Sequence, residues 1–186
     1  MATPNNRGLM IGRFQPFHKG HLELSKQILQ DCEELIIAIG SAQFNYSYSD
    51  PFTAGERATM AHAALVESKL DMSRCYIIPI VNDENNARWL AHLKSMVPSF
   101  DIIYSGNDFV SILLKRQAEV LRPKFSKKKY YNGTYIRELM TNSNRWKEYV
   151  PNSVVEVIEK IDGINRIRFL RKEKLFEERK MIKLTK

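Results

Sequence analysis

The chain has 186 residues and a formal net charge of +8, with 44% hydrophobic and 27% charged residues. This length suits one α/β domain, and no apolar run approaches the ~20 residues that a membrane-spanning helix needs. No signal-peptide pattern precedes Leu9, and Cys32 and Cys75 do not suggest an oxidising compartment. We therefore expect a cytoplasmic protein with two buried thiols.

The positive charge is concentrated at one end of the chain. Residues 163–186 carry nine Lys or Arg against three Glu, so residues 1–162 are nearly balanced. The basicity is thus a property of the tail and does not by itself indicate a nucleic-acid-binding body.

The first predicted unit is a strand, a turn and a helix. An apolar run at 9–11 predicts a buried strand, and apolar residues at 22, 24, 28 and 29 predict an amphipathic helix. The turn between them reads Gly12-Arg13-Phe14-Gln15-Pro16-Phe17-His18-Lys19-Gly20-His21. Its two histidines share one face at a helix N-terminus, where backbone N–H groups favour an anion.

A lone histidine at this place would most often be a solvated or capping residue. Here Arg13, His18, Lys19 and His21 crowd one turn, and Gly20 permits close backbone approach, so we predict a phosphate site. Zinc is not indicated, because His-x-x-His supplies only two ligands and the cysteines lie at no ligand spacing.

The second predicted strand covers residues 34–41, a nearly continuous apolar run that ends in Gly40 and Ser41. The loop 42–52 that follows is polar and aromatic, and it lies where α/β proteins bind ligands; a surface loop with incidental aromatics is the alternative. Thr53 and Glu56 form a capping box for a helix that reaches about Ser68. Arg57 in this helix is a candidate for a buried ion pair.

Residues 75–81 and 100–106 predict a third and a fourth strand, and Val120 with Leu121 a short last one. The segment from Asn82 opens a helix in which Trp89 either stacks on a flat heterocycle or packs in the core. After the fourth strand, Gly106 would let the backbone approach a sugar or base. Asn107 either accepts from ribose hydroxyls or caps a helix.

A basic connector at 122–129 precedes Asn132-Gly133-Thr134-Tyr135-Ile136-Arg137, and is a candidate lid over polyphosphate. Ser153 and Glu156 suggest another capping box, and Gly163 is expected to end that helix. The basic amphipathic tail, 163–186, should pack on the domain or on a neighbouring subunit. Membrane-surface or RNA contact is a lesser alternative.

Successive strand and helix units, with Gly or Ser at the end of the first, second and fourth strands, predict an α/β, Rossmann-like parallel sheet flanked by helices, with C-terminal helices after it. Since Gly-x-Gly-x-x-Gly is absent, a dehydrogenase-type dinucleotide site is not expected. We divide the chain into a domain at 1–162 and the tail helix at 163–186.

The segment 12–21 resembles the His-x-Gly-His signature of the nucleotidylyltransferase superfamily, and its longer form is similar to the archaeal type of nicotinamide-nucleotide adenylyltransferase. Residues 51–57, 86–89 and 132–137 resemble the same type, so the likeness covers most of 8–162. It implies transfer of AMP from ATP to nicotinamide mononucleotide, giving NAD and pyrophosphate. The attacking phosphate is already an anion, so alignment and charge neutralisation would suffice for catalysis.

The resemblance also implies roles for single residues. His18, His21 and Arg13 would hold the α- and β-phosphates, Thr134 and Arg137 the β- and γ-phosphates, and Asn86 with Trp89 the nicotinamide. Mg²⁺ would be held by phosphate oxygens and water, without a metal site made by the protein. The other expected nucleotide contacts are Gly12, Phe14, Gly20, Ser41, Gly106, Asn107 and Gly133.

Two positions depart from the family pattern. Asn132 stands where Ser is usual, and Ser49 stands where an Arg contacts the mononucleotide's phosphate. Arg13 or a lysine of 124–129 would have to substitute for that Arg. The alternatives are adenylyl or cytidylyl transfer to another acceptor, such as phosphopantetheine or FMN, and a non-enzymatic nucleotide- or RNA-binding protein. The resemblance further implies a homo-oligomer, typically a hexamer, without nucleic-acid or membrane partners.

Overall fold

A computed structural model describes residues 6–83, 85, 87–106, 110, 112, 119–123 and 130–184. Within these residues the chain forms a five-stranded parallel sheet of order β3-β2-β1-β4-β5. The strands are β1 (Arg7–Gly12), β2 (Glu34–Ile39), β3 (Cys75–Pro79), β4 (Ile102–Tyr104) and β5 (Glu119–Leu121). The strand order reverses direction next to β1, and the crevice at such a switch point is where α/β sheets bind ligands.

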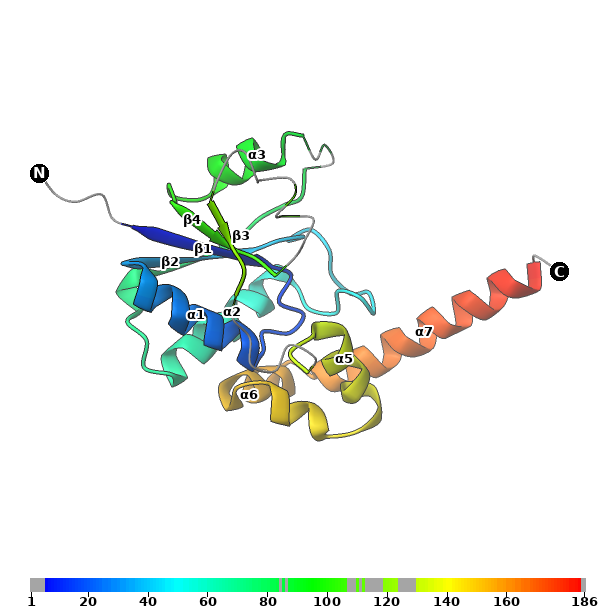
Figure 1. The fold of residues 1–186 in the computed structure, drawn as a ribbon. Coiled ribbons are helices and arrows are strands. Elements are labelled where there is room, and N and C mark those ends of the chain that lie inside the picture. Colours follow the sequence, from blue (N-terminus) through cyan, green and yellow to red (C-terminus); the bar gives the residue numbers. More distant parts are fainter. Residues whose placement is uncertain are drawn as a thin grey trace, which may run out of the picture.

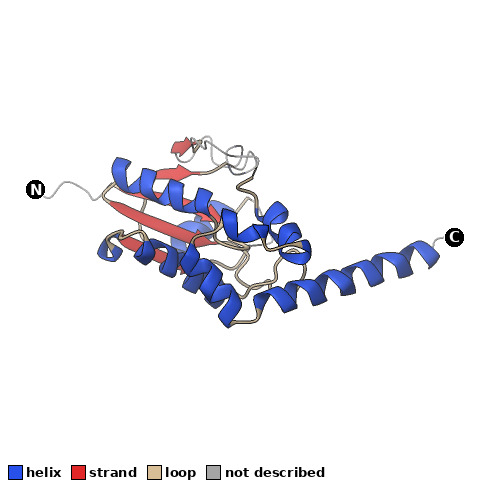
Figure 2. Ribbon diagram, turned by 90° about the horizontal axis from the view of Figure 1, so that it is seen from below, coloured by secondary structure: helices blue, strands red, loops and turns tan. Residues whose placement is uncertain are grey.

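Helices cover both faces of the sheet (Figures 1 and 2). One face carries α1 and α2, with α5 and α6 beyond them, and the other face carries α3. The predicted Rossmann-like parallel fold is confirmed. The helices are α1 (Lys19–Asp31), α2 (Ala54–Glu67), α3 (Trp89–Met96), α5 (Gly133–Asn142), α6 (Asn152–Lys160) and α7 (Gly163–Leu184), with short 3-10 turns η1 (Met72–Arg74) and η2 (Arg145–Tyr149).

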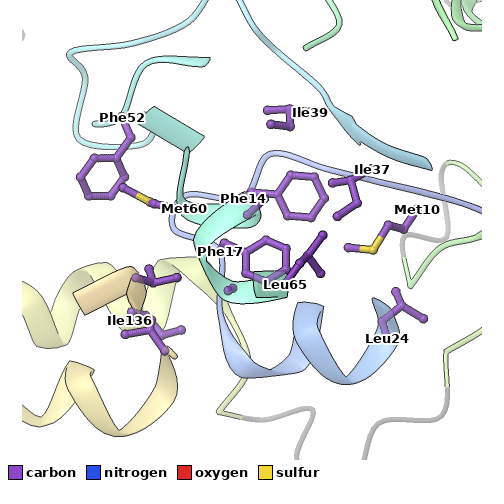
Figure 3. Packing of buried hydrophobic residues seen from close by; sticks show 14 of the residues in the cluster. Met10, Phe14, Phe17, Leu24, Ile37, Ile39, Phe52, Met60, Leu65 and Ile136 are labelled. Carbon is purple, nitrogen blue, oxygen red and sulfur yellow. The ribbon is translucent and has the colours of Figure 1, made fainter. Parts of the chain in front are cut away.

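Two hydrophobic clusters sandwich the sheet because side chains alternate along each strand. On β1, Met10 faces the cluster under α1 and α2, whereas Leu9 faces the cluster under α3. Figure 3 shows the larger cluster, in which Phe17 of the first turn lies beside Leu65 of α2. The residues before α1 are therefore held in the core, which fixes the position of its N-terminus.

Helix α1 packs very closely on β1, and Gly8 makes this possible. A Cβ at Gly8 would lie 2.4 Å from Cγ2 of Ile28, 3.0 Å from the sulfur of Cys32 and 3.1 Å from the ring of Tyr104. Any other residue type would therefore force the Ile28 side chain or helix α1 to move. The distance between the sheet and the C-terminal half of α1 is thus set by a glycine.

Three local predictions need correction. Helix α3 begins at Trp89 and not at Asn82. Ser153 does not cap α6, because the Oε2 atom of Glu67 accepts from both its backbone N–H, at 2.9 Å, and its hydroxyl, at 2.6 Å. The carboxylate from α2 thus satisfies the start of α6 and joins the two helices.

Gly163 does not end α6 either. The helix ends at Lys160, and Asp162 adopts the left-handed conformation, with φ of 54°, while Gly163 is the first residue of α7. Asparagine and aspartate tolerate that conformation better than most residues. Asp162, through its left-handed backbone conformation, therefore makes the turn that we expected from glycine.

The first turns of α7 pack into the body of the domain, and the rest of the helix extends away from it (Figure 1). Ile167 is fully buried, and Arg166 forms a two-point ion pair with Glu56, with N···O distances of 2.7 and 2.9 Å. Beyond Arg171 the described side chains are exposed, including Phe176. In the part of the chain described, no helix is long and apolar enough to cross a membrane.

Candidate active site

His18 and His21 lie at the first turn of α1 and cap each other. The Nδ1 of His18 accepts from the backbone N–H of His21 at 3.3 Å, and the Nδ1 of His21 accepts from the backbone N–H of His18 at 3.2 Å. Their rings are stacked, with centroids 3.5 Å apart. Because each Nδ1 is an acceptor, the proton of each neutral ring is on Nε2. The pair can therefore offer two parallel N–H donors to an anion at the helix N-terminus.

Both imidazoles are neutral at pH 7. Burial lowers the pKa of His18 to about 3. Burial, and then the charge of His18, lower the pKa of His21 well below 6.5. A bound anion would raise both pKa values, because a nearby negative charge favours the protonated form. The pair is thus a source of directed N–H donors, and of positive charge only when an anion is present.

A polar pocket of about 310 Å³ opens in front of the two rings. It is lined by Arg13, Phe14, Gln15, His18, His21, Tyr131, Asn132, Gly133, Thr134 and Arg137. None of these ten residues is acidic, so the pocket suits an anionic ligand. It brings together the two turns that we predicted from segments more than a hundred residues apart.

A second, more apolar pocket of about 240 Å³ adjoins the first and shares Phe14, the two histidines, Tyr131 and Asn132 with it. The residues that line only this second pocket are Met10, Ile11, Leu24, Tyr104, Ser105, Gly106 and Pro123. The two pockets together reach a volume that small-molecule sites commonly have. Their contrast in polarity suits a ligand with an anionic part and a flat or apolar part.

Two glycines allow the turn before α1 and the turn before α5 to pack closely against each other. A Cβ at Gly20 would lie 2.8 Å from the Cβ of Tyr131, and a Cβ at Gly133 would lie 3.0 Å from the carbonyl oxygen of Gln15. Only glycine lets the segments approach this closely without displacement. The glycines of both motifs therefore serve the packing of one turn against the other.

Asn132 caps helix α5, as expected for an amide at this position. Its Oδ1 accepts from the backbone N–H of Thr134 at 2.8 Å and from that of Tyr135 at 3.4 Å. Since α1 and α5 both begin at the pocket, their positive helix ends reinforce each other there. The replacement of the family's usual Ser thus preserves the cap.

Arg137 is buried, with 4% of its surface exposed, and three hydrogen bonds fix its guanidinium. Nη1 donates to the Gln15 carbonyl at 2.8 Å, Nη2 to the Thr134 hydroxyl at 3.2 Å and Nε to the Tyr48 carbonyl at 3.1 Å. Burial and then the charge of Arg13 lower the pKa of Arg137, yet an arginine stays charged at pH 7. A guanidinium has five N–H donors, so two remain for a ligand.

Arg13 is half exposed and is oriented by Asp50, with Nη1 at 3.3 Å from Oδ1 of the carboxylate. Ser49, where the family pattern has an arginine, is exposed and its hydroxyl lies 3.1 Å from that of Ser47. Ser49 itself carries no positive charge. The lysines of 124–129, which we considered as substitutes, lie outside the described residues.

Arg57 is fully buried, but it does not form the ion pair that we expected. Its guanidinium donates to the carbonyls of Arg13, Gly40 and Ser41 at 2.9 to 3.1 Å, and to that of Thr53 at 3.2 Å. These carbonyls belong to the segments that follow β1 and β2 and to the turn before α2. A buried charge needs such partners, and here they tie the loops around the site together.

Of the remaining residues that we predicted to contact the nucleotides, some lie at the pockets and others lie away from them. Phe14 packs edge-on against the ring of His21, with centroids 4.7 Å apart, and Gly12 ends β1. Ser41 exchanges two hydrogen bonds with the side chain of Asn82, and Trp89 packs against the cluster under α3. Neither Ser41 nor Trp89 lines the two pockets described above. The predicted contacts Asn86 and Asn107 lie outside the described residues.

Sequence reasoning missed three residues that shape the site. The Gln15 side chain exchanges two hydrogen bonds with the backbone of Phe52, at 2.8 and 3.0 Å. Asp50 orients Arg13, and Tyr131 lines both pockets. An acidic residue in a loop facing a cluster of arginines was a usable signal for Asp50. Gln15 and Tyr131 act through the packing of distant segments, which no local pattern reveals.

A parallel sheet of this order, with an imidazole pair and an anion pocket at its switch point, is the architecture of the nucleotidylyltransferases. Residues 9–167 match the family model described as cytidylyltransferase-like. Proteins named nicotinamide-nucleotide adenylyltransferase are also similar to the chain. The one from Caldivirga maquilingensis is 48% identical over 88% of this chain and 93% of its own length. The one from Pyrobaculum arsenaticum is 49% identical over 87% and 92%.

A third relative, from Archaeoglobus fulgidus, is 45% identical over 87% of this chain and 95% of its own. The chain therefore belongs to the cytidylyltransferase-like family and, within it, to the nicotinamide-nucleotide adenylyltransferases.

Solved structures share the fold at low identity. A bifunctional NMN adenylyltransferase/ADP ribose pyrophosphatase from Francisella tularensis superposes with a TM-score of 0.77 at 20% identity. The match covers 98% of this chain but only 57% of that one, so this chain spans a little over half of that protein's length. A nicotinic acid mononucleotide adenylyltransferase from Plasmodium falciparum gives a TM-score of 0.62 at 15% identity, over 87% and 98%.

Proposed function

We propose that this protein transfers the adenylyl group of ATP to nicotinamide mononucleotide, giving NAD and pyrophosphate. The observation that supports this most is the polar pocket, where two helix N-termini, the histidine pair and two arginines converge without a carboxylate among the lining residues. Relatives at 42–49% identity that carry this name support the choice of acceptor.

In the proposed reaction, a phosphate oxygen of the mononucleotide attacks the α-phosphorus of ATP. The new P–O bond forms as the bond from the α-phosphorus to the oxygen that bridges to the β-phosphorus breaks, and pyrophosphate leaves with that electron pair. The nucleophile is already ionised, so no side chain has to remove a proton. The protein aligns the two substrates and stabilises the charge that shifts toward the leaving group.

The geometry suggests a role for each group. The Nε2–H donors of His18 and His21, with Arg13, would hold the α- and β-phosphates. The Thr134 hydroxyl, the positive N-terminal end of α5 and the two remaining donors of Arg137 would hold the β- and γ-phosphates. Because these groups are held by hydrogen bonds before the ligand arrives, little reorganisation opposes the reaction.

The adenosine would occupy the more apolar pocket, where Gly106 and Tyr104 form part of the wall. The nicotinamide would lie toward Ser41 and Trp89, beyond the ends of β2 and β3. We keep Asn86 and Asn107 as proposed contacts for the nicotinamide and the ribose. Gly12, Gly20 and Gly133 would act by allowing the close packing of backbone around the nucleotide.

A divalent cation, Mg²⁺ in this proposal, would neutralise the triphosphate and help the pyrophosphate leave. Among the described residues, no group of three or more His, Cys, Asp or Glu could hold a metal ion. The donor set thus fits a cation that arrives on the phosphates and keeps most of its water. One solved structure of the Francisella tularensis protein is described as complexed with AMP and a Mn ion.

The test is to incubate the protein with ATP, Mg²⁺ and one acceptor at a time, and to measure NAD and pyrophosphate. We expect equal amounts of both with nicotinamide mononucleotide, and a comparison with nicotinic acid mononucleotide, FMN and phosphopantetheine defines the selectivity. His18→Ala should lower kcat by roughly 10²–10³, the scale for one preorganised donor. Turnover with another acceptor alone, or wild-type turnover in His18→Ala, would contradict the proposal.

We also propose a cytoplasmic homo-oligomer, hexameric as the family resemblance implies. The tail at 163–186 would pack on the domain at 1–162 through its first turns and contribute to subunit contacts beyond them, because Phe169, Phe176 and Met181 are exposed along α7. Light scattering after size-exclusion chromatography measures the state directly. A monomer at micromolar concentration would argue against this part of the proposal.

A further inference from the structure

Helix α7 contacts the loop at residues 42–52 through cations that lie against two tyrosines. The guanidinium carbon of Arg171 is 4.9 Å from the ring centroid of Tyr48, and Nη1 of Arg171 donates to the Tyr48 hydroxyl at 2.8 Å. The ammonium of Lys174 is 5.5 Å from the same ring. One turn earlier, Arg166 lies 4.8 Å from the ring of Tyr46. Such contacts attract a cation to the aromatic face.

The same loop also accepts hydrogen bonds from the two arginines of the polar pocket. The backbone carbonyl of Tyr48 accepts from Nε of Arg137, and the carboxylate of Asp50 accepts from Arg13. The other two bonds of Arg137 end on Gln15 and Thr134, which belong to the two motif turns. The loop therefore helps to orient the Arg137 side chain through the backbone carbonyl of Tyr48.

The conformation of residues 43–50 depends on contacts with other parts of the chain. Residues 43–47 and Ser49 are exposed, and the hydrogen bonds within 47–50 are local to that turn. Tyr48 is half buried; it packs against the larger hydrophobic cluster, and its hydroxyl accepts from Arg171 of α7. Loops with few buried contacts open at low free-energy cost, so the contacts of Tyr48 with α7 limit how far its carbonyl can move.

We propose that Arg171 and Tyr48 are positioning residues for Arg137. Arg171 holds the side chain of Tyr48, and the Tyr48 carbonyl then fixes the guanidinium of Arg137 toward the nucleotide phosphates. The C-terminal helix thereby takes part in substrate binding, although Arg171 does not line the polar pocket. The inference rests on the proposed function only in that the ligand of Arg137 is a nucleotide phosphate.

The first experiment compares Arg171→Ala with Arg168→Ala, which removes the same charge from an exposed site on the same helix. The dissociation constant of a non-hydrolysable ATP analogue with Mg²⁺ is measured by calorimetry. We expect Arg171→Ala to weaken binding about 5- to 10-fold, the scale of one cation contact with a hydrogen bond. Arg168→Ala should bind as the wild type does, and equal affinities in the two variants would overturn the proposal.

The second experiment separates positioning from a general loss of stability. Arg171→Ala is combined with Arg137→Lys, which keeps a cation but loses the fork of donors. If Arg171 acts through Arg137, its substitution should have less than a twofold effect in that background. Arg171→Lys should restore part of the affinity, because it retains a cation at the Tyr48 ring. A full effect of Arg171→Ala in the Arg137→Lys background would refute the proposed route.

Failure of this inference can be told apart from failure of the proposed function. If the wild type makes no NAD but the analogue still binds more weakly to Arg171→Ala, the acceptor was wrong and the positioning role stands. If NAD forms and the affinity for the analogue is the same in Arg171→Ala, the function stands and the positioning role fails. Melting temperatures of all variants, measured in parallel, confirm that each is folded at the assay temperature.

Discussion

Replacing His18 with asparagine should make the protein less sensitive to acid. His18 is 5% exposed and its pKa is about 3 in the folded protein, against about 6.5 in an unfolded chain. Between these values the unfolded state binds more protons than the folded state. Stability therefore falls as the pH drops below about 6.5, and the loss continues until the pH approaches the folded pKa.

The size of this effect follows from the two pKa values. At pH 4.5 the unfolded imidazole is almost fully protonated and the folded one is almost fully neutral. The wild type should then lose about 2.5 kcal/mol of unfolding free energy from His18 alone between pH 7 and pH 4.5. Asparagine does not titrate, but it is a favoured N-cap and can keep the bond to the backbone N–H of His21.

The assay is urea unfolding followed by circular dichroism at both pH values. We expect the wild type to lose about 2.5 kcal/mol more than His18→Asn over this interval, while the His21 contribution remains in both proteins. His62→Asn, at an exposed position of α2, should behave as the wild type does. If the wild type and His18→Asn lose the same stability, His18 is not buried in the neutral form and our account of the pair is wrong.

Three further substitutions test the packing around the site. Gly133→Ala should cost about 1–3 kcal/mol of stability in urea unfolding and weaken ATP binding, because its Cβ would press on the Gln15 carbonyl. Gly55→Ala is the control, since Gly55 lies in open surroundings on α2. This control should be neutral or stabilising by roughly 0.5–1 kcal/mol in the same assay. Arg57→Ala should destabilise by at least about 3 kcal/mol, since buried carbonyls lose their donor, and a small effect would show that water replaces it. Trp89→Ala should mainly raise the KM for the mononucleotide, and an unchanged KM would assign Trp89 to the core alone.

The sheet and both motif turns could be predicted from the sequence because their signals are local. β2 is a continuous apolar run, so its burial on both faces follows from composition, and Thr53 with Glu56 forms the expected capping box. His18 and His21 could be placed at a helix entry from their spacing. What spacing could not reveal is that each caps the other, which determines both tautomers.

Two of the misplaced details, at Ser153 and Arg57, share one physical cause, which is that tertiary partners replaced the expected ones. Ser153 has the pattern of a cap, but a carboxylate from α2 satisfies the start of α6 instead. Arg57 looked like half of an ion pair, and the strand ends offered carbonyls in place of an acid. The contact of Arg171 with Tyr48 joins positions 123 residues apart, so no window of sequence contains it.

The glycine at position 8 has a consequence for the chemistry at the opposite end of α1. Ile28, which would collide with a side chain there, is ten residues from His18, about 15 Å along the helix axis. An alanine at position 8 would force Ile28 to move, and we expect part of that displacement to reach the imidazoles through the helix. Screens for impaired catalysis should therefore recover changes at the amino end of β1, far from any atom that meets the nucleotide.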